Sequence, residues 1–337
     1  MTDRGFAEAV DLAVAEAMAA DDRVMVWGED VPLIRRNLAA RFGPDRVRGT
    51  PISESAFLGA GVGAAMAGLR PVVEVMLVDF LGVCFDALLN HAAKMEDFSG
   101  GRWPVPMVVR VACGGGYGDG GQHEQCLWGL LAGVPGLSVV VPSRPDDAAG
   151  LMGAAIEHPG PVVFCEHKLL AENWLDWMGG ASRETVHFAL PPAGARGEVP
   201  HPPSPVPIGV GATRRSGEDV ALLSVGVGVH RCLEAAEDLA ADGVEATVVD
   251  LRSVSPLDER LVTEVADRCP AVLVVDEDYR RFGLSGEIAA VVAESGASPR
   301  FGRLAVDRTL PYARPLEDAA LPSADRIGEA VRRLLGP

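Results

Sequence analysis

Lysine is almost absent from this sequence of 337 residues. Lys94 and Lys168 are its two lysines, and 47 acidic residues stand against 30 lysines and arginines, for a formal net charge of -17. A nucleic acid is held through its phosphates by clustered Lys and Arg, so this balance argues against a nucleic-acid partner. We interpret the acidity as a solvated surface, because net charge bears on solubility and on the steering of partners and not on fold.

Long apolar runs and paired cysteines are also missing. No uninterrupted apolar run reaches about 18 residues, the length that crosses a bilayer as a helix, and no basic leader precedes the amphipathic segment 2–22. The six cysteines form no close pairs and mostly lie in apolar runs, which indicates neither a zinc site nor a disulfide framework. We therefore expect a cytoplasmic protein, or one already processed, with no membrane partner.

Strand-like and helix-like apolar periods alternate along the chain. In the first half, the strand-like runs lie at 24–28, 71–77, 105–112, 137–142 and 161–167. In the second half, they lie at 219–226, 244–251, 271–278 and 303–306. Runs that are apolar on both faces and separated by helices are typical of a parallel sheet covered on both sides. The pattern and the length predict two doubly wound α/β domains.

Proline is concentrated between Pro191 and Pro207, where seven of the chain's prolines lie. This composition resists helix and sheet and favours an extended spacer. We predict a first domain at 1–175, a Pro-rich linker at 176–207 and a smaller second domain at 208–337. The last helix is expected to begin after an N-cap at Ser323 and to end at Gly336.

Glu54 stands in the stretch TPISESA, at the entrance to a run of small residues at 57–69. Burying a carboxylate near apolar helices costs several kcal/mol unless something hydrogen-bonds to it. Glu54 either belongs to a capping box with its flanking serines, compensating the helix N-terminus, or meets a partner in a site. Composition alone favours the capping interpretation.

A glycine-dense loop, CGGGYGDGGQHEQ at 113–125, directly follows the predicted strand 105–112. Open parallel sheets place their ligand-binding loops at this end of their strands. His123 ends the loop and could act as acid, base or oxyanion donor, since the ordinary pKa of histidine lies near neutrality. A surface histidine that caps a helix is the alternative. The glycines do not match a dinucleotide fingerprint.

Several motifs occur together in one order along nearly the whole chain: GED at 28–30, TPISES at 50–55, AGLRPVVEVMLVDF at 67–80, SGG at 99–101, QHEQ at 122–125, DLRSVSPLD at 250–258 and LPYARPLED at 310–318. In these motifs the chain resembles the β chain of the thiamine diphosphate-dependent, decarboxylating first component of 2-oxoacid dehydrogenase complexes. The resemblance implies a transketolase-like pyrimidine-binding domain with a parallel sheet, followed by a smaller domain of the transketolase C-terminal type.

The resemblance also implies an assembly of two α and two β chains, with thiamine diphosphate bound where an α and a β chain meet. The β chain contributes the pyrimidine side. Glu54 matches the glutamate that hydrogen-bonds N1′ of the aminopyrimidine, Phe80 the aromatic that lines the ring, and His123 the histidine at the mouth of the site. We predict Glu54 and His123 as catalytic residues, and Glu54, Phe80, Ser53 and Leu58 as cofactor-binding residues.

No metal ligand is predicted in this chain. Related enzymes hold the diphosphate through Mg²⁺, which is bound by a GDG segment and a later Asn pair, because a hard cation prefers carboxylate and amide oxygens. GDG occurs at 118–120, but the asparagines are Asn37, Asn90 and Asn173, so no Asn pair follows it. The resemblance therefore assigns Mg²⁺ and the diphosphate to the partner α chain.

The predicted function is that of a β subunit, active only with its α subunit, in oxidative decarboxylation of a 2-oxoacid and acyl transfer to a lipoyl group on an acyltransferase or carrier protein. One alternative is a transketolase-like split enzyme that transfers a two-carbon ketol unit from a sugar phosphate to such a carrier. Another is a non-catalytic scaffold subunit. The chain departs from the family at Glu124, where Ser is frequent, and an acid there would raise the pKa of His123 if the two side chains met.

Overall fold

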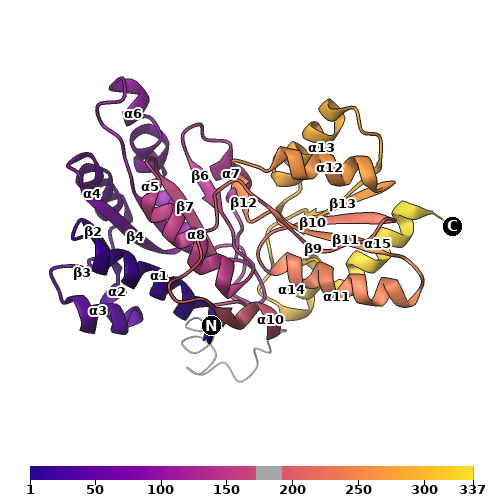
Figure 1. Ribbon diagram of the computed structural model, residues 1–337, viewed down its shortest axis with the longest axis horizontal. Coiled ribbons are helices and arrows are strands. Elements are labelled where there is room, and N and C mark those ends of the chain that lie inside the picture. The colour runs from indigo at the N-terminus through magenta and orange to yellow at the C-terminus, as the bar shows by residue number, and fades with distance from the viewer. Residues whose placement is uncertain (172–191, 337) are drawn as a thin grey trace.

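Two lobes lie side by side in the computed structural model, which describes residues 1–171 and 192–336 (Figure 1). The first lobe is built on a sheet of the order β12 (Ser253–Ser255), β6 (Ser138–Val140), β7 (Val162–His167), β5 (Val108–Cys113), β4 (Arg70–Leu77), β2 (Val24–Glu29) and β3 (Val47–Thr50). The second is built on β14 (Arg300–Val306), β13 (Ala271–Tyr279), β10 (Val220–Ser224), β11 (Ala246–Asp250) and β9 (Ala212–Arg215).

Most neighbouring strands in both sheets run parallel. The seven-stranded sheet is parallel from β6 to β3, and the five-stranded sheet is parallel from β14 to β11. The edge strands β12 and β9 pair antiparallel with β6 and β11. The predicted fold class, two mostly parallel α/β units, is confirmed. Strand β12 comes from the second half of the chain and joins the sheet of the first lobe.

Helices cover both faces of each sheet, as the apolar strands require. In the first lobe the helices are α1 (Phe6–Ala20), α2 (Val31–Ile34), α3 (Arg36–Phe42), α4 (Glu54–Met66), α5 (Leu81–Asp86), α6 (Met95–Phe98), α7 (Trp128–Ala132) and α8 (Pro145–Glu157). In the second half they are α10 (Pro192–Ala195), α11 (Val227–Ala241), α12 (Glu259–Arg268), α13 (Leu284–Ser295), α14 (Arg314–Ala320) and α15 (Ala324–Leu335). A 3₁₀ turn, Val78–Phe80, precedes α5, and a π-helical turn, Ala87–Ala92, follows it.

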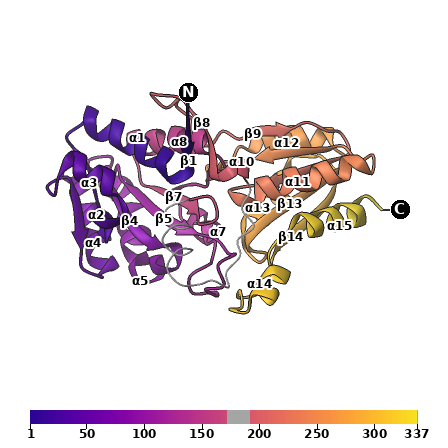
Figure 2. The ribbon, with the colours of Figure 1, turned by 90° about the horizontal axis from the view of Figure 1, so that it is seen from below.

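The hydrophobic core is shared between the lobes. Helices α1 and α8 lie on one face of the seven-stranded sheet, and α4 and α5 lie on the other (Figure 2). Every residue of β5 and β7 is buried between these layers. The cluster on the α4 side continues through α7 to α12 and α13, on one face of the second sheet, while α11 and α15 cover its other face. The two lobes are therefore packed together by apolar contact.

Part of the Pro-rich segment forms a strand. Arg196–Val199 form β8, which pairs antiparallel with β1 (Thr2–Gly5), and α10 directly precedes it. The expectation that this composition resists sheet is wrong for these four residues. Strands β1 and β8 form a two-stranded sheet. The next proline, Pro200, lies just after β8, where its missing N–H removes no hydrogen bond from the sheet. Residues 176–191 of the predicted linker lie outside the described residues.

The last helix has the predicted caps. The Ser323 hydroxyl accepts a hydrogen bond from the Arg326 N–H at 3.3 Å, and Gly336 follows α15 with φ of 80°.

Within residues 1–171 and 192–336, every helix is too short or too polar to cross a membrane. All six cysteines are free and buried.

Candidate active site

The predicted site residues gather at one edge of the seven-stranded sheet. Glu54 follows β3, Phe80 follows β4, and His123 lies in the loop after β5. These strands run parallel, so their carboxyl ends meet at the same edge. In open α/β sheets this edge is where ligands bind. The topology thus brings together three residues that lie far apart in the sequence.

Glu54 is the first residue of α4 and is half-buried. Its carboxylate makes no hydrogen bond or ion pair with any residue that the structure describes. The negative charge of Glu54 contributes to the pKa shifts of two neighbouring groups. Burial raises the pKa of Glu29, and the carboxylates of Asp30 and Glu54 add to the rise. Burial, followed by the charge of Glu54, raises the pKa of the Cys84 thiol to about 12. Glu54 therefore lies beside the end of β2 and the start of α5 with an unused acceptor.

Ser53 and Leu58, two other predicted cofactor-binding residues, have different surroundings in the structure. Ser53 occupies the N-cap position of α4, but its hydroxyl donates back to the Pro51 carbonyl at 3.1 Å and makes no capping hydrogen bond. The capping-box interpretation therefore loses its main contact. Leu58 is fully buried in the core beside Phe57, and none of its surface is exposed. Leu58 therefore packs α4 against the hydrophobic core. Its contact with a cofactor stays a prediction.

Phe80 and His123 are in contact. Their ring centroids lie 5.8 Å apart with the planes at 80°, the edge-to-face arrangement that aromatic rings favour. The Phe80 carbonyl accepts a weak hydrogen bond from the Cys84 thiol at 3.6 Å, which ties Phe80 to the same helix that faces Glu54. Gln125 Nε2 donates to Asp79 Oδ1 at 2.7 Å and so joins the loop of His123 to the end of β4.

Glu124 organises the glycine-rich loop, residues 113–125. Its Oε1 accepts the Tyr117 N–H at 2.6 Å, and its Oε2 accepts the Gly120 N–H at 2.9 Å. The carboxylate is buried and faces back into the loop. The sequence left open whether Glu124 would meet the His123 side chain; in the structure its hydrogen bonds go to the backbone of the loop instead.

The segment GDG at 118–120 is part of this loop. Gly120 has φ of 69°, and a Cβ there would lie 2.9 Å from the Tyr312 ring, so both conformation and space require glycine. Asn37 lies in α3, and Asn90 donates to Asp86 at 2.6 Å, so neither of these two serves the loop. Asn173 lies outside the described residues. Asn173 is the one asparagine that follows GDG in the sequence, so no Asn pair follows it.

Helix α4 uses its small residues on two faces. A Cβ at Gly61 would lie 2.7 Å from Val73 and 3.1 Å from Met107, so this glycine lets α4 pack closely on the sheet. Gly59 and Gly63, by contrast, have nothing within 4 Å of an added Cβ. They line an open hollow of ≈ 410 Å³ between α4 and α5, together with Ser55, Met66 and His91. The outer face of α4 is therefore open at these two glycines.

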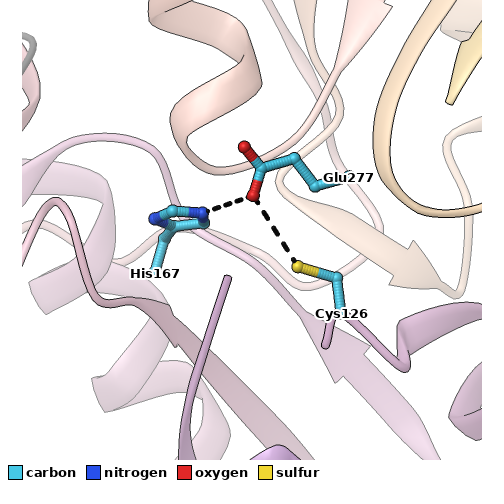
Figure 3. A group of neighbouring side chains, drawn as sticks. All are labelled: Cys126, His167 and Glu277. Carbon is cyan, nitrogen blue, oxygen red and sulfur yellow. Dashed lines mark hydrogen bonds and ion pairs between the residues drawn. The ribbon is translucent and has the colours of Figure 1, made fainter. Parts of the chain in front are cut away.

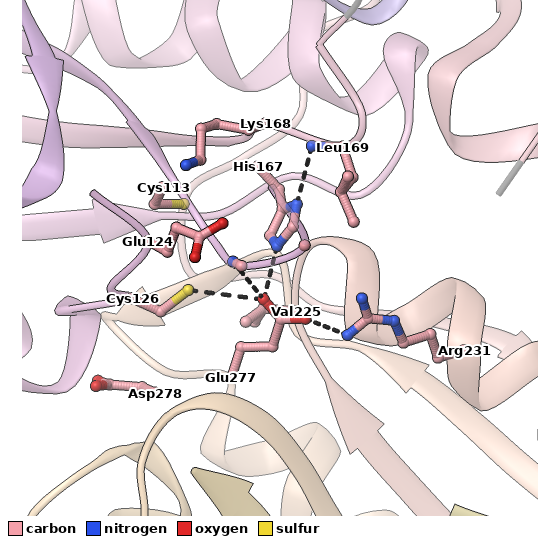
Figure 4. Close-up of polar contacts among 12 residues, drawn as sticks. Cys113, Glu124, Cys126, His167, Lys168, Leu169, Val225, Arg231, Glu277 and Asp278 are labelled. Atoms are coloured by element: carbon pink, nitrogen blue, oxygen red, sulfur yellow. Dashed lines mark hydrogen bonds and ion pairs between the residues drawn. The ribbon is translucent and has the colours of Figure 1, made fainter. Parts of the chain in front are cut away.

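A buried polar cluster lies behind the glycine-rich loop, where the two lobes meet (Figure 3). Its members are Cys126, His167 and Glu277. His167 Nε2 lies 2.7 Å from Glu277 Oε2, and Arg231 pairs with the other oxygen of Glu277 (Figure 4). The Leu169 N–H donates to His167 Nδ1 at 3.2 Å. Nδ1 thus accepts and the Nε2–H donates to Glu277, so the cluster is a hydrogen-bond network around the Glu277–Arg231 ion pair.

The cluster was not predicted from the sequence. Its three residues lie at 126, 167 and 277, in the loop after β5 and at the ends of β7 and β13, and the partner Arg231 lies in α11. One signal was present: Glu277 and His167 stand within or at the end of apolar runs, where an unpaired charge is costly. That signal marks a buried charge but does not identify its partner.

Models of two domain families match the chain. "Transketolase, pyrimidine binding domain" matches residues 4–173, and "Transketolase, C-terminal domain" matches residues 209–327. This chain is similar to the solved structure "Split gene transketolase, inactive beta4 tetramer", with a TM-score of 0.78 and 22% sequence identity over 98% of each chain. This likeness shows the fold.

Full-length relatives are closer in sequence. The acetoin:2,6-dichlorophenolindophenol oxidoreductase subunit beta of Cupriavidus necator is 37% identical, over 97% of this chain and 96% of that protein. The 2-oxoisovalerate dehydrogenase subunit beta of Bacillus subtilis is 36% identical, over 99% of each. The pyruvate dehydrogenase E1 component subunit beta-1, mitochondrial, of Arabidopsis thaliana is 38% identical, over 97% of this chain and 88% of that protein.

Proposed function

We propose a function from the premise that this chain belongs to the transketolase-like family of β subunits of 2-oxoacid dehydrogenase first components. It is the β subunit of a thiamine diphosphate-dependent dehydrogenase that decarboxylates a 2-oxoacid oxidatively and passes the acyl group to a lipoyl carrier. One observation of the structure carries the proposal: the Glu54 carboxylate, unpaired among the described residues, lies at the carboxyl edge of the sheet beside the open face of α4.

The residues present fit the pyrimidine half of a thiamine diphosphate site. Glu54 offers a free carboxylate where an aminopyrimidine nitrogen needs a proton partner, and the half-buried Phe80 offers an aromatic wall. Bound thiamine diphosphate supplies the carbanion chemistry that decarboxylation requires. In this proposal Glu54 shares a proton with the pyrimidine, Phe80 holds the ring in place, and His123 donates or accepts a proton at the mouth. The roles of Ser53 and Leu58 remain part of the same proposal.

The other half of the site is proposed to belong to an α subunit. In the sequence no Asn pair follows the GDG at 118–120, since Asn173 is the one asparagine after it, which supports placing Mg²⁺ and the diphosphate on that partner. The open face of α4, with Gly59 and Gly63, is the proposed contact, in an assembly of two α and two β chains. A lipoyl-bearing acyltransferase or carrier protein is the proposed acceptor.

The domain division, the cellular location and the reaction class also belong to this proposal. Division at 1–175, 176–207 and 208–337 is supported by the separate sheets of the two lobes, although β12 crosses to the first. A cytoplasmic location is supported by six free, buried cysteines, as expected in a reducing compartment. The named relatives favour a dehydrogenase over a ketol-transferring split enzyme, because their names describe acetoin, 2-oxoisovalerate and pyruvate enzymes.

The purified chain alone is expected to bind thiamine diphosphate at least about 100-fold more weakly than the α–β complex, since it lacks the diphosphate contacts and each 1.4 kcal/mol lost is tenfold in affinity. Isothermal titration calorimetry of the chain alone, of the α subunit alone and of the mixture, in the presence of Mg²⁺, measures this difference. Tight binding by the chain alone would contradict the half-site.

Reaction class is tested with the assembled complex and a lipoylated carrier domain. The complex is given either a panel of 2-oxoacids or a ketose phosphate, and mass spectrometry detects the acylated lipoyl group. We expect carbon dioxide release and carrier acylation from a 2-oxoacid, and no acylation from the ketose phosphate. Acylation from the ketose phosphate alone would establish the alternative.

A further inference from the structure

One oxygen of a buried carboxyl group in α14 has no hydrogen-bond donor. Glu317 is fully buried, and its Oε1 accepts the Gly116 N–H of the glycine-rich loop. Its Oε2 is buried and has no hydrogen-bond partner among residues 1–171 and 192–336. A buried carboxylate oxygen without a donor carries the full cost of its lost hydration. A proton on this oxygen, or on a group across from it, would remove that cost.

The group across from Glu317 is a second buried carboxyl. Glu124 lies within hydrogen-bonding reach of Glu317. Burial raises the pKa of Glu124 to about 7; Lys168 opposes this rise, and the Glu317 charge adds to it. Two carboxylates facing each other in a buried site cannot both ionise cheaply, so such a pair holds one proton between its members. A proton on either carboxyl would give Glu317 Oε2 its missing hydrogen bond.

Few charges surround the pair. Lys168 is buried, with its ammonium 4.7 Å from the Tyr117 ring centroid, and it balances one of the two carboxylates. Asp119 lies in the same loop and adds negative charge near Lys168. Arg314 pairs with the exposed Asp318 and donates to the Gly116 carbonyl. Because Arg314 is paired with Asp318 and Asp119 adds a further negative charge, Lys168 leaves an excess of negative charge around the pair, which favours a single shared proton.

We propose that Glu124 and Glu317 share one proton, and that this proton holds the glycine-rich loop in the conformation that presents His123 beside Phe80. The proposal rests on the proposed function, in which His123 acts at the mouth of the site. Glu124 and Glu317 are positioning residues: they come from different lobes and act on His123 through the backbone.

The connection from the carboxyl pair to His123 is short. Glu124 fixes the Gly120 N–H, and the Gly120 carbonyl accepts the His123 N–H at 3.0 Å. The Lys168 ammonium donates to the His123 carbonyl at 2.6 Å. When the pair loses its proton, the facing charges repel, the contact between α14 and the loop opens, and His123 loses its place against Phe80.

Substitutions at Glu317 separate the shared proton from mere packing. In Glu317→Gln, Oε1 can keep the Gly116 N–H, while the amide Nε2–H replaces the shared proton permanently. In Glu317→Ala both contacts are lost. Glu329→Gln, an exposed carboxylate on α15, controls for loss of one negative charge. Turnover is measured against pH in the complex with the α subunit, and infrared titration of the purified chain in D₂O follows protonated carboxyl groups.

The ordinary glutamate pKa is about 4.3, so a folded-state value near 7 means that the proton's contribution is complete below pH 4.3 and is lost as the pH rises through 7. Turnover of the natural protein and of the control should therefore fall above pH 7. Glu317→Ala should lower kcat on the order of 10- to 100-fold with KM little changed, since misplaced groups cost rate. Glu317→Gln should restore most of that loss and move the alkaline fall upward by about one pH unit or more.

In the infrared titration, a protonated carboxyl band that disappears near pH 7 should be present in the natural chain and missing from Glu317→Gln. An unchanged band in Glu317→Gln, an unchanged alkaline fall, or an effect as severe as that of Glu317→Ala would overturn the shared proton. If no protein in the series, including the natural one, shows turnover, the proposed function fails. The infrared titration then still tests whether Glu124 and Glu317 share a proton.

Discussion

Replacing Glu54 by Gln is expected to lower turnover of the assembled enzyme by on the order of 10²- to 10⁴-fold, the usual contribution of a general acid–base group. Glutamine keeps the shape of the side chain but cannot share a proton with a pyrimidine nitrogen. Because the Glu54 carboxylate has no hydrogen bond to lose among the described residues, the fold and the α–β assembly should persist. Turnover in the complex, with gel filtration to confirm assembly, measures the effect.

The same variant tests the capping interpretation. A carboxylate in the first turn stabilises a helix by about 0.3–1 kcal/mol, so a capping role would appear as a small loss of stability with turnover retained. Glu157→Gln, an exposed acid at the end of α8, is the matched control for charge removal. Retained turnover in Glu54→Gln would remove Glu54 from the proposed site and leave it a helix-end residue.

The fold was predictable because its strands are apolar on both faces. Runs such as 105–112 and 161–167 became β5 and β7, in which every residue is buried. Edge elements were less visible: β1, β3 and β12 are strands of only four, four and three residues, and β1 and β12 pair with strands far away in the sequence. Strand β8 was not predicted either, because it pairs with the distant β1 and lies within a Pro-rich segment.

The candidate site was predictable in part. A resemblance in local motifs selected Glu54, Phe80 and His123, and the parallel topology places all three at one edge of the sheet. The contacts of Glu124 and Glu317, which are 193 positions apart, arise only when α14 packs on the glycine-rich loop. Sequence patterns report the period of burial, and they do not show which distant groups a polar side chain meets.

Loss of Glu277 is expected to destabilise the protein by about 3–5 kcal/mol, because removing one partner of a buried ion pair leaves the Arg231 guanidinium charged and without its carboxylate. Glu277 accepts from His167, Arg231 and the Gly115 N–H, and the Cys126 thiol lies 4.0 Å away. In Glu277→Gln the amide nitrogen would face these donors. The cluster joins β7 of the first lobe to β13 and α11 of the second, so the lobes should separate more readily. Urea unfolding at pH 7 measures the change.

An exposed pair gives the matched control. Glu245 pairs with Arg215 at 2.6 Å but is half exposed, and Glu245→Gln should cost about 1 kcal/mol or less. Burial alone raises the pKa of Glu277, but Arg231 and His167 outweigh it and lower the pKa to about 2. A lowered folded-state pKa contributes stability that is present above the unfolded value, about 4.3, and is lost as the pH falls towards 2. The stability gap between the natural protein and Glu277→Gln should therefore be widest above pH 5 and narrow steadily below it. Equal costs for Glu277→Gln and Glu245→Gln at pH 7 would contradict a buried ion-pair network between the lobes.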